Sequence, residues 1–414
     1  MLVTGANTPI CDKLVPYLFE QLMRGEIMEA IGLIATATFG LEAIVAQELR
    51  DLGYGDLTVE NGKVSFTADL EAICKANLWL RTADRVKLRM GEFRATTFDE
   101  LFDQTQALPW GDWLPANARF PVVGKSVKST LYSISDCQAI VKKAVVESLK
   151  ERYQKEWFPE DGPLYKIEVA ILKDVVTLTI DTTGPGLHKR GYRTLIGEAP
   201  LKETLAAAMV ILSRWEHDTA LIDPFCGSGT IPIEAALLGL NIAPGLNRSF
   251  ISEDWPNIPK KLWQAARQEA QELAQLDRRL HIIGTDIDPK VLKVARRNAE
   301  AAGVGEFIHL QAKPLSELSS QRKYGKIICN PPYGERIGER REVARLYKEM
   351  SQVFQRLDTW SFYILTAHPE FEKLFGRRAT KRRKLYNGNI QVQFYQYFGP
   401  RPPRRQTSAH ESLI

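Results

Sequence analysis

The 414-residue chain lacks the patterns that mark disulfide-linked, metal-dependent or membrane proteins. Its six histidines form no close pair, so the sequence gives no support to a metal site. It has no apolar run of about 18 residues and no charged leader with a cleavage site, so we expect a soluble, cytoplasmic protein without a membrane partner. Its cysteines lie far apart without a Cys-x-x-Cys pair, which argues against a disulfide framework or a zinc ribbon; they are Cys11, Cys74, Cys137, Cys226 and Cys329.

Two phosphate-binding motifs are also incomplete. Gly227 and Gly229 are followed by Pro232 where a dinucleotide fingerprint needs a third glycine, which argues against a nicotinamide or flavin pyrophosphate as a ligand. Gly124-Lys125-Ser126 imitates the end of a P-loop, but Arg119 stands where that motif needs glycine. The sequence therefore favours another class of ligand.

A strand, a glycine-rich turn and a helix are predicted over residues 220–236. Gly227 and Gly229 have no Cβ, so the backbone can adopt positive φ and approach a ligand closely. Amides at the start of the following helix can meet a carboxylate. The turn runs through Asp223, Cys226, Gly227, Ser228, Gly229 and Thr230, and we interpret Cys226 as a small apolar residue that fills the loop.

A second short apolar strand ends in acids at Asp286 and Asp288, before a helix predicted over 290–302. An acid at the end of the second strand suits two hydrogen bonds to ribose hydroxyls, and we favour Asp286 for that role. Asp288 is equally suited to cap the helix, with Pro289 in its first turn.

A third signal is Asn330-Pro331-Pro332-Tyr333, which follows the apolar stretch 326–329. Open α/β sheets bind ligands at the carboxyl ends of their strands. The Asn330 side-chain oxygen and the Pro331 carbonyl can each accept one N–H of an exocyclic amine on a nucleobase. The fixed φ of Pro331 and Pro332 holds that carbonyl still, and Tyr333 offers a face for stacking. A proline-rich loop that closes a strand is the plainer alternative.

Together these segments resemble the Rossmann-like class I methyltransferases, and the Asn-Pro-Pro-Tyr form resembles those that methylate exocyclic or amide nitrogens. The resemblance covers residues 186–400 and implies S-adenosyl-L-methionine as cofactor, with its methionine end over 223–230 and its ribose on Asp286. Two features depart from the family. Residues 240–280 form an insertion with an amphipathic helix over 260–276, and Ala312-Lys313 stands where many relatives carry an acid for the adenine amine. Adenine recognition near Ala312 must then use backbone groups or another residue.

The part before residue 186 reads as α+β. Residues 29–95 predict a small domain of ferredoxin-like type, with a hairpin turn at Asn61-Gly62. Residues 75–183, which overlap it, resemble the THUMP domain, an RNA-binding module. The RNA contacts that this resemblance implies are Lys125, Lys128, Lys142 and Lys143, followed by Arg190 in the linker run 187–193.

Charge is unevenly distributed. The net charge is +5, and nine lysines or arginines but no acid lie between Gly376 and Arg405, including Arg382 and Arg383. Such a local basic patch suits contact with a phosphate backbone, although a solvated loop with a basic tail over 401–414 is the alternative. Residues 1–28 predict an extension, and Met28 is an alternative start.

The order of modules resembles THUMP-containing RNA guanine-N2 methyltransferases, in particular the bacterial type that acts on 23S ribosomal RNA. In the implied mechanism the base leaves its stack and enters the pocket. Asn330 and Pro331 then orient its amine for in-line methyl transfer. The alternatives are a transfer-RNA guanine-N2 enzyme, a DNA or RNA adenine-N6 enzyme, a protein glutamine methyltransferase, and an RNA chaperone that binds without catalysis.

Overall fold

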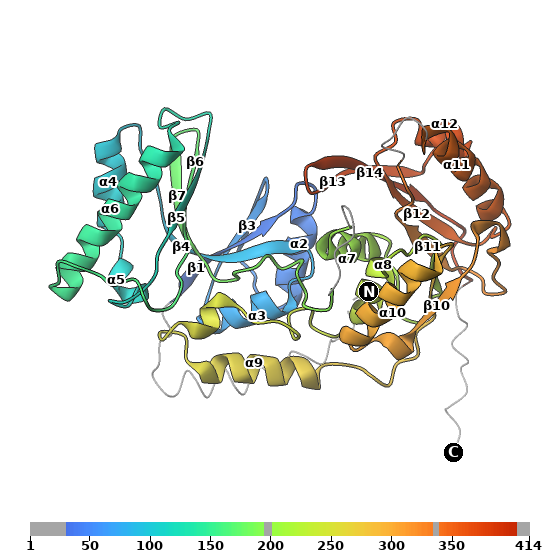
Figure 1. The fold of residues 1–414 in the computed structure, drawn as a ribbon, viewed down its shortest axis with the longest axis horizontal. Coiled ribbons are helices and arrows are strands. Elements are labelled where there is room, and N and C mark those ends of the chain that lie inside the picture. The colour runs from blue at the N-terminus through green and yellow to red at the C-terminus, as the bar shows by residue number, and fades with distance from the viewer. Residues whose placement is uncertain (1–29, 194–200, 334–338, 404–414) are drawn as a thin grey trace, which may run out of the picture.

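The computed structural model describes residues 30–193, 201–333 and 339–403, which build two seven-stranded sheets (Figure 1). The extension predicted for residues 1–28 and the tail beyond residue 403 lie outside the described residues. The two sheets confirm an α/β domain preceded by an α+β region.

The first sheet is continuous through the whole N-terminal region, in the order β2-β3-β1-β4-β7-β6-β5. Its long strand β4 pairs with β1 through its first half and with β7 through its second half. The ferredoxin-like and THUMP-like parts therefore share one strand, and no flexible linker separates them. The strands are β1 (Ile31–Ala37), β2 (Leu57–Glu60), β3 (Lys63–Ala68), β4 (Ala83–Arg94), β5 (Val122–Val127), β6 (Ile167–Leu172) and β7 (Val175–Asp181).

Local sequence signals set the boundaries of this region. Gly62 has φ +78° in the turn between β2 and β3, a conformation that favours glycine. Thr97 and Glu100 form a capping box at the start of α4. The helices that pack on the sheet are α2 (Glu42–Asp51), α3 (Glu71–Trp79), α4 (Phe98–Gln106), α5 (Trp110–Trp113) and α6 (Ile134–Tyr153).

The second sheet has the order β10-β9-β8-β11-β12-β14-β13. Strands β8 to β12 are parallel, and β14 and β13 add an antiparallel hairpin at one edge. Because β8 lies between β9 and β11, the strand order reverses beside it, and ligands bind at such a reversal. The strands are β8 (Leu221–Asp223), β9 (Ile282–Asp286), β10 (Ile308–Ala312), β11 (Lys326–Cys329), β12 (Ser361–Thr366), β13 (Lys381–Asn387) and β14 (Ile390–Tyr397).

Alternating apolar residues give this sheet two buried faces. Leu221 and Ile328 belong to one core, and Ile222 and Ile327 belong to the other. The first core is covered by α7 (Glu203–Leu212), α8 (Thr230–Gly239) and α10 (Pro289–Ala301). The second is covered by α11 (Glu339–Gln355) and α12 (Phe371–Phe375).

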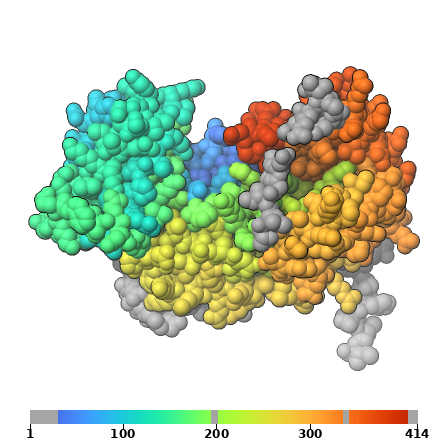
Figure 2. All heavy atoms as spheres, viewed as in Figure 1, coloured from blue at the N-terminus to red at the C-terminus, as the bar shows by residue number. Residues whose placement is uncertain are grey.

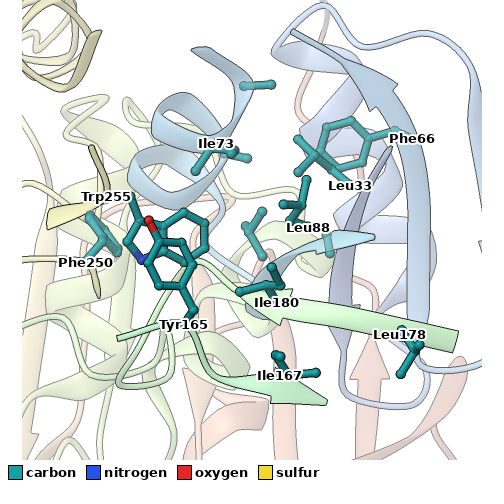
Figure 3. Close-up of a cluster of buried hydrophobic side chains, with 14 of the residues drawn as sticks. Leu33, Phe66, Ile73, Leu88, Tyr165, Ile167, Leu178, Ile180, Phe250 and Trp255 are labelled. Atoms are coloured by element: carbon teal, nitrogen blue, oxygen red, sulfur yellow. The ribbon is translucent and has the colours of Figure 1, made fainter. Parts of the chain in front are cut away.

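The middle of the predicted insertion over residues 240–280 packs in the core of the N-terminal region, whereas its ends, at Leu240 and Leu280, pack in the first core of the second sheet. Trp255 stacks on Tyr165, with ring centroids 4.3 Å apart, and its indole N–H donates to the Leu164 carbonyl at 2.9 Å. Phe250 and Trp263 stack at 5.2 Å in the same core. Figure 3 shows Phe250, Trp255 and Tyr165 together in this core. The helix α9 (Lys260–Glu272) then runs beside α3 (Figure 1). The insertion therefore completes the core of the N-terminal region.

We expect Trp255→Ala to destabilise the protein by about 3–5 kcal/mol, because it leaves a cavity in a core shared by both regions. Trp157→Ala is the matched control, since Trp157 is 74% exposed. Urea denaturation of the full chain, followed by circular dichroism, measures both. A Trp255 variant as stable as the Trp157 variant would mean that the insertion does not complete this core.

Candidate cofactor and transfer site

The carboxyl ends of β8, β9 and β11 meet at one cavity of about 470 Å³. The cavity brings together the predicted cofactor acid Asp286 and the whole predicted transfer segment, although these residues are far apart in sequence. It is lined by Pro224, Phe225, Asp286, Ile287, Lys313, Pro314, Leu315, Asn330, Pro331, Pro332, Tyr333, Leu346 and Glu349.

The glycine-rich loop has the conformation that its glycines predict. Gly227 has φ +50° and Gly229 has φ +86°, and Gly229 is the N-cap of α8. A Cβ on Gly229 would lie 3.2 Å from the Cβ of Ala295, whereas a Cβ on Gly227 would meet no described atom within 4 Å. Gly229 therefore permits close packing of two helices, and Gly227 borders open space that a ligand can approach.

The two acids after β9 have different roles. Asp286 lines the cavity, and its carboxylate oxygens accept from the Gly227 and Asp288 amides, both at 3.0 Å. Asp288 accepts from the Lys290 amide at 2.8 Å and caps α10, with Pro289 in the first turn. The structure therefore places Asp288 as the cap and leaves Asp286 as the candidate ribose ligand.

Asp223 supports the loop from behind the cavity wall. Its side chain is 1% exposed and accepts from the Phe225 amide at 3.1 Å. Burial raises the pKa of the Asp223 carboxyl well above its ordinary value, and the nearby charge of Asp286 raises it further. Cys226 fills space beside the next strand, since a Cβ on Gly284 would lie 3.1 Å from its sulfur.

The remaining loop residues are held by side chains that local patterns did not identify. Asn298, which is buried on α10, donates to the Ser228 carbonyl at 3.0 Å. Arg193 donates to the Thr230 hydroxyl at 2.7 Å. These bonds fix the start of α8 from two directions.

The wall expected to face adenine is formed by residues after Ala312, not by Ala312 itself. Ala312 is exposed, and the cavity is lined by Lys313, Pro314 and Leu315. The Lys313 amide already donates to the Asp286 carbonyl at 3.0 Å, so that backbone group is taken by the strand pairing. Ile287, which is 77% exposed, adds an apolar surface to the same cavity.

The transfer segment is held by two tyrosines. The Tyr333 hydroxyl donates to the Asn330 side-chain oxygen. The Tyr347 hydroxyl donates to the Pro332 carbonyl at 2.9 Å and lies 2.9 Å from the Thr366 hydroxyl. Tyr347 is fully buried on α11, and no local sequence pattern points to it because its partners are distant in the chain.

The predicted RNA contacts in the THUMP-like half differ in their ion pairs. Lys128, which follows β5, and Lys143, which is on α6, are exposed. Lys125 pairs with Glu168 at 3.0 Å, and Lys142 pairs with Glu160 at 2.6 Å. On β13, Arg382 is exposed and lies 3.3 Å from Glu372. Arg383, its neighbour, donates to the Gly40 carbonyl at 3.4 Å.

Arg190, predicted to contact RNA, is instead a buried structural residue. Its side chain is 2% exposed and lies 3.3 Å from the fully buried carboxylate of Glu234 on α8. It also donates to the Leu187 carbonyl at 2.8 Å and to the Arg81 carbonyl. Burial alone would lower the pKa of this guanidinium, but Glu234 raises it above its ordinary value. The Arg190 side chain is therefore not available to a phosphate.

Three family models match successive parts of the chain. The RlmL ferredoxin-like domain matches residues 32–87, the THUMP domain matches 95–181, and the RMKL-like methyltransferase domain matches 190–396. The Bacillus subtilis protein named "Putative RNA methyltransferase YpsC" is 54% identical over 92% of this chain and 99% of its own length. The chain belongs to the RMKL-like methyltransferase family.

Solved structures of similar proteins agree with this family. A Listeria monocytogenes protein described as a "predicted N6-adenine-specific DNA methylase" is 55% identical, with 92% of this chain and 98% of that chain covered and a TM-score of 0.87. SMU.472, described as "a putative methyltransferase complexed with SAH", that is, with S-adenosylhomocysteine, is 47% identical, with 91% of this chain and 100% of that chain covered and a TM-score of 0.86. S-adenosyl-L-methionine is therefore the cofactor of this chain.

The residues present fit that cofactor. The open space beside Gly227 and the carboxylate of Asp286 lie at the start of α8, and Phe225, Ile287 and Leu315 give the cavity apolar walls. Within the described ranges, no group of three or more metal-ligating side chains is arranged to hold a metal ion. In the same part of the chain, no helix has the length and apolar character needed to cross a bilayer.

We expect Asp286→Ala to weaken binding of S-adenosylmethionine roughly ten-fold or more, because a charge-assisted hydrogen bond is worth about 1.5–3 kcal/mol. Asp286→Asn removes the charge but keeps the size of the side chain and one acceptor for the Gly227 amide, so it shows how much of the lost affinity is due to charge. Isothermal titration calorimetry measures the affinities. Asp288→Ala serves as the control and should leave affinity unchanged while it removes a cap worth about 1 kcal/mol. Equal affinities for the wild-type and Asp286→Ala proteins would place the ribose contact elsewhere.

Proposed function

We propose that this chain transfers a methyl group from S-adenosylmethionine to the exocyclic N2 amine of a guanosine in RNA, with 23S ribosomal RNA as the substrate. The observation that carries this proposal is the single cavity that holds both Asp286 and the segment 330–333. A cofactor on Asp286 and an amine on Asn330 would share that cavity, so the two reactants would be positioned together.

The chemistry of an aromatic amine suits these residues. The cofactor supplies an electrophilic methyl group on a sulfonium. The Asn330 oxygen has two lone pairs, so it can accept from Tyr333 and still accept one N–H of the amine. The Pro331 carbonyl would accept the second N–H, which directs the nitrogen lone pair along the line of transfer. No strong base is needed, because the methylated, cationic amine is far more acidic than the neutral amine.

The N-terminal region supports RNA as the substrate class. A continuous seven-stranded sheet with a THUMP-domain match precedes the methyltransferase domain, and exposed lysines at 128 and 143 suit phosphate contact. The Bacillus relative is named as an RNA methyltransferase, whereas the Listeria relative is described as a DNA methylase. The module order resembles that of guanine-N2 methyltransferases of ribosomal RNA, which favours RNA over DNA as the substrate.

Glu349 supports guanine over adenine. Adenine and guanine both carry an exocyclic amine, so Asn330 and Pro331 do not separate them. Glu349 adds a carboxylate to the same cavity wall. A carboxylate accepts the N1–H of guanine, whereas adenine presents a lone pair at N1 and would be repelled. The wall is therefore suited to a base with a donor beside its amine.

We expect N2-methylguanosine as the product when the full chain is incubated with labelled S-adenosylmethionine and unmodified 23S ribosomal RNA. Digestion to nucleosides and mass spectrometry identify the product. Unmodified transfer RNA and double-stranded DNA are the parallel substrates. Label in transfer RNA alone would show that the substrate is transfer RNA rather than ribosomal RNA. N6-methyladenosine as the product would show that the target base is adenine, although methyl transfer to an exocyclic amine would still be supported.

We expect Asn330→Ala to reduce the rate of transfer on the order of 10²–10³-fold, by analogy with the loss of one positioned donor in an oxyanion hole. Orientation acts on the reaction step more than on ground-state binding, so cofactor and RNA affinity should stay near wild type. Single-turnover rates on stoichiometric RNA measure the effect. Tyr333→Phe tests the hydroxyl that holds Asn330 and keeps the ring. A near-normal rate for Asn330→Ala would remove this residue from the mechanism.

A further inference from the structure

The hairpin of β13 and β14 has two unlike faces. Leu385, Val392 and Phe394 are fully buried on one face, in the core beneath α8. The opposite face consists of three cross-strand pairs with a polar, cationic and aromatic character. These pairs are Arg382 with Tyr395, Lys384 with Gln393, and Tyr386 with Gln391.

Only one end of the polar face, at Tyr395 and Tyr397, is covered by a helix. The Tyr395 ring lies 4.8 Å from Phe371, and the Tyr397 ring lies 5.0 Å from Phe375, so α12 covers this end. The last residue of β12, Thr366, pairs with Gln393, and the hairpin continues past that point toward the carboxyl edge of the sheet. The other end of the polar face, at Gln391 and Tyr386, therefore projects beyond the end of β12.

A second cavity of about 330 Å³ lies on this face and extends from the Arg382–Tyr395 pair to Gln391. Gln391 and Gln393 face it, and within the described residues neither side-chain amide has a hydrogen-bond partner. Arg382 also lines it, with its side chain 52% exposed. The other lining residues are Ala367, His368, Pro369 and Tyr395. The cavity thus offers amide donors and acceptors beside a cation.

The second cavity is close to the transfer site. Cys329 pairs with Ile364, so the segment that follows β11 runs level with the end of β12, about one strand spacing or 5 Å away. Tyr347 contacts both places. Its hydroxyl donates to the Pro332 carbonyl, and its ring lies edge-on to His368 at 5.5 Å. Adjacent nucleotides of one strand can therefore reach both cavities.

The hairpin also reaches the first domain. The Tyr386 ring lies 6.4 Å from Phe39, which is 57% exposed, and the Lys384 ammonium lies 5.4 Å from the Tyr386 ring. In Figure 2 this part of the chain borders a hollow between the THUMP-like lobe and the methyltransferase lobe. An RNA strand that leaves the transfer site along the hairpin would enter that hollow.

We propose that the polar face of this hairpin, beyond the end covered by α12, is a second nucleotide subsite, which binds an unpaired RNA nucleotide adjacent to the methylated one. The inference rests on the proposed function and names a further part of its substrate. Gln391 and Gln393 bind the edge of the flanking base, since an amide offers both donors and an acceptor. Arg382 binds the phosphate between the two nucleotides, and Tyr386 with Phe39 gives the strand an aromatic surface beyond it.

The test compares Gln391→Ala/Gln393→Ala in the full chain with a matched control, Gln264→Ala/Gln271→Ala. Both control glutamines are exposed on α9, outside the two cavities. We expect the hairpin variant to lose about ten-fold in single-turnover kcat/KM on the substrate RNA, as expected for loss of base contacts. Calorimetry should give an unchanged affinity for S-adenosylmethionine, which shows that the fold is intact.

Two further RNAs make the test specific. One has an abasic residue on the 5′ side of the target nucleotide, and the other has an abasic residue on the 3′ side. With one of these RNAs the wild-type rate should fall to that of the hairpin variant, and the hairpin variant should lose nothing more. A hairpin variant as fast as the control on intact RNA overturns the subsite, and so does a variant that loses further on both abasic RNAs.

Direct RNA affinity separates this inference from the proposed function. If the wild-type chain binds RNA but does not methylate it, the proposed reaction fails. Weaker RNA binding by the hairpin variant than by the control would then still support the subsite. If the two variants bind RNA equally well, the subsite fails even when N2-methylguanosine forms. A wild-type chain that does not bind RNA overturns both.

Discussion

The buried ion pair between Arg190 and Glu234 is the contact on which the arrangement of the two lobes depends. The side chains lie 3.3 Å apart and are 2% and 0% exposed. Glu234 belongs to the helix that begins at the cofactor loop, and Arg190 also bonds the Arg81 carbonyl of the first domain. Removal of either partner would leave a buried charge without compensation, at a cost of about 3–5 kcal/mol. The cofactor loop is therefore fixed to the RNA-facing region.

The hairpin meets the first domain through Tyr386 and Phe39, and only β12 separates its strand β14 from β11, which leads into the candidate transfer segment. The insertion packs Trp255 and Phe250 into the N-terminal core, and the hairpin packs Tyr386 beside Phe39. These two contacts connect the lobes at separate places (Figure 1). An RNA held by the first sheet would meet the transfer site at a fixed position relative to its anchor.

Short-range order explains what the sequence could predict. The glycine turn and the segment 330–333 have local sequence signals, and the structure has the turn at the start of α8 and the segment directly after β11. Capping by Asp288 was one of two alternatives that the local pattern left open, and the structure has the cap. Residues with distant partners were not predictable. Tyr347 acts through Pro332 and Thr366, and Arg190 is paired with a glutamate on another helix. The sequence predicted a phosphate contact at Arg190, because its partner Glu234 is distant in the chain and gives no local signal.

The most direct test of the account is whether both lobes must act in the same molecule. Asn330→Ala lacks the transfer group, and Lys128→Glu/Lys143→Glu reverses two exposed charges on the THUMP-like half. We measure single-turnover methylation of 23S ribosomal RNA by each variant and by an equimolar mixture. The account predicts that each variant is impaired and that the mixture is no faster than the two variants taken separately. A mixture that recovers the wild-type rate would show that one molecule can bind RNA for another, which contradicts a fixed path from anchor to transfer site.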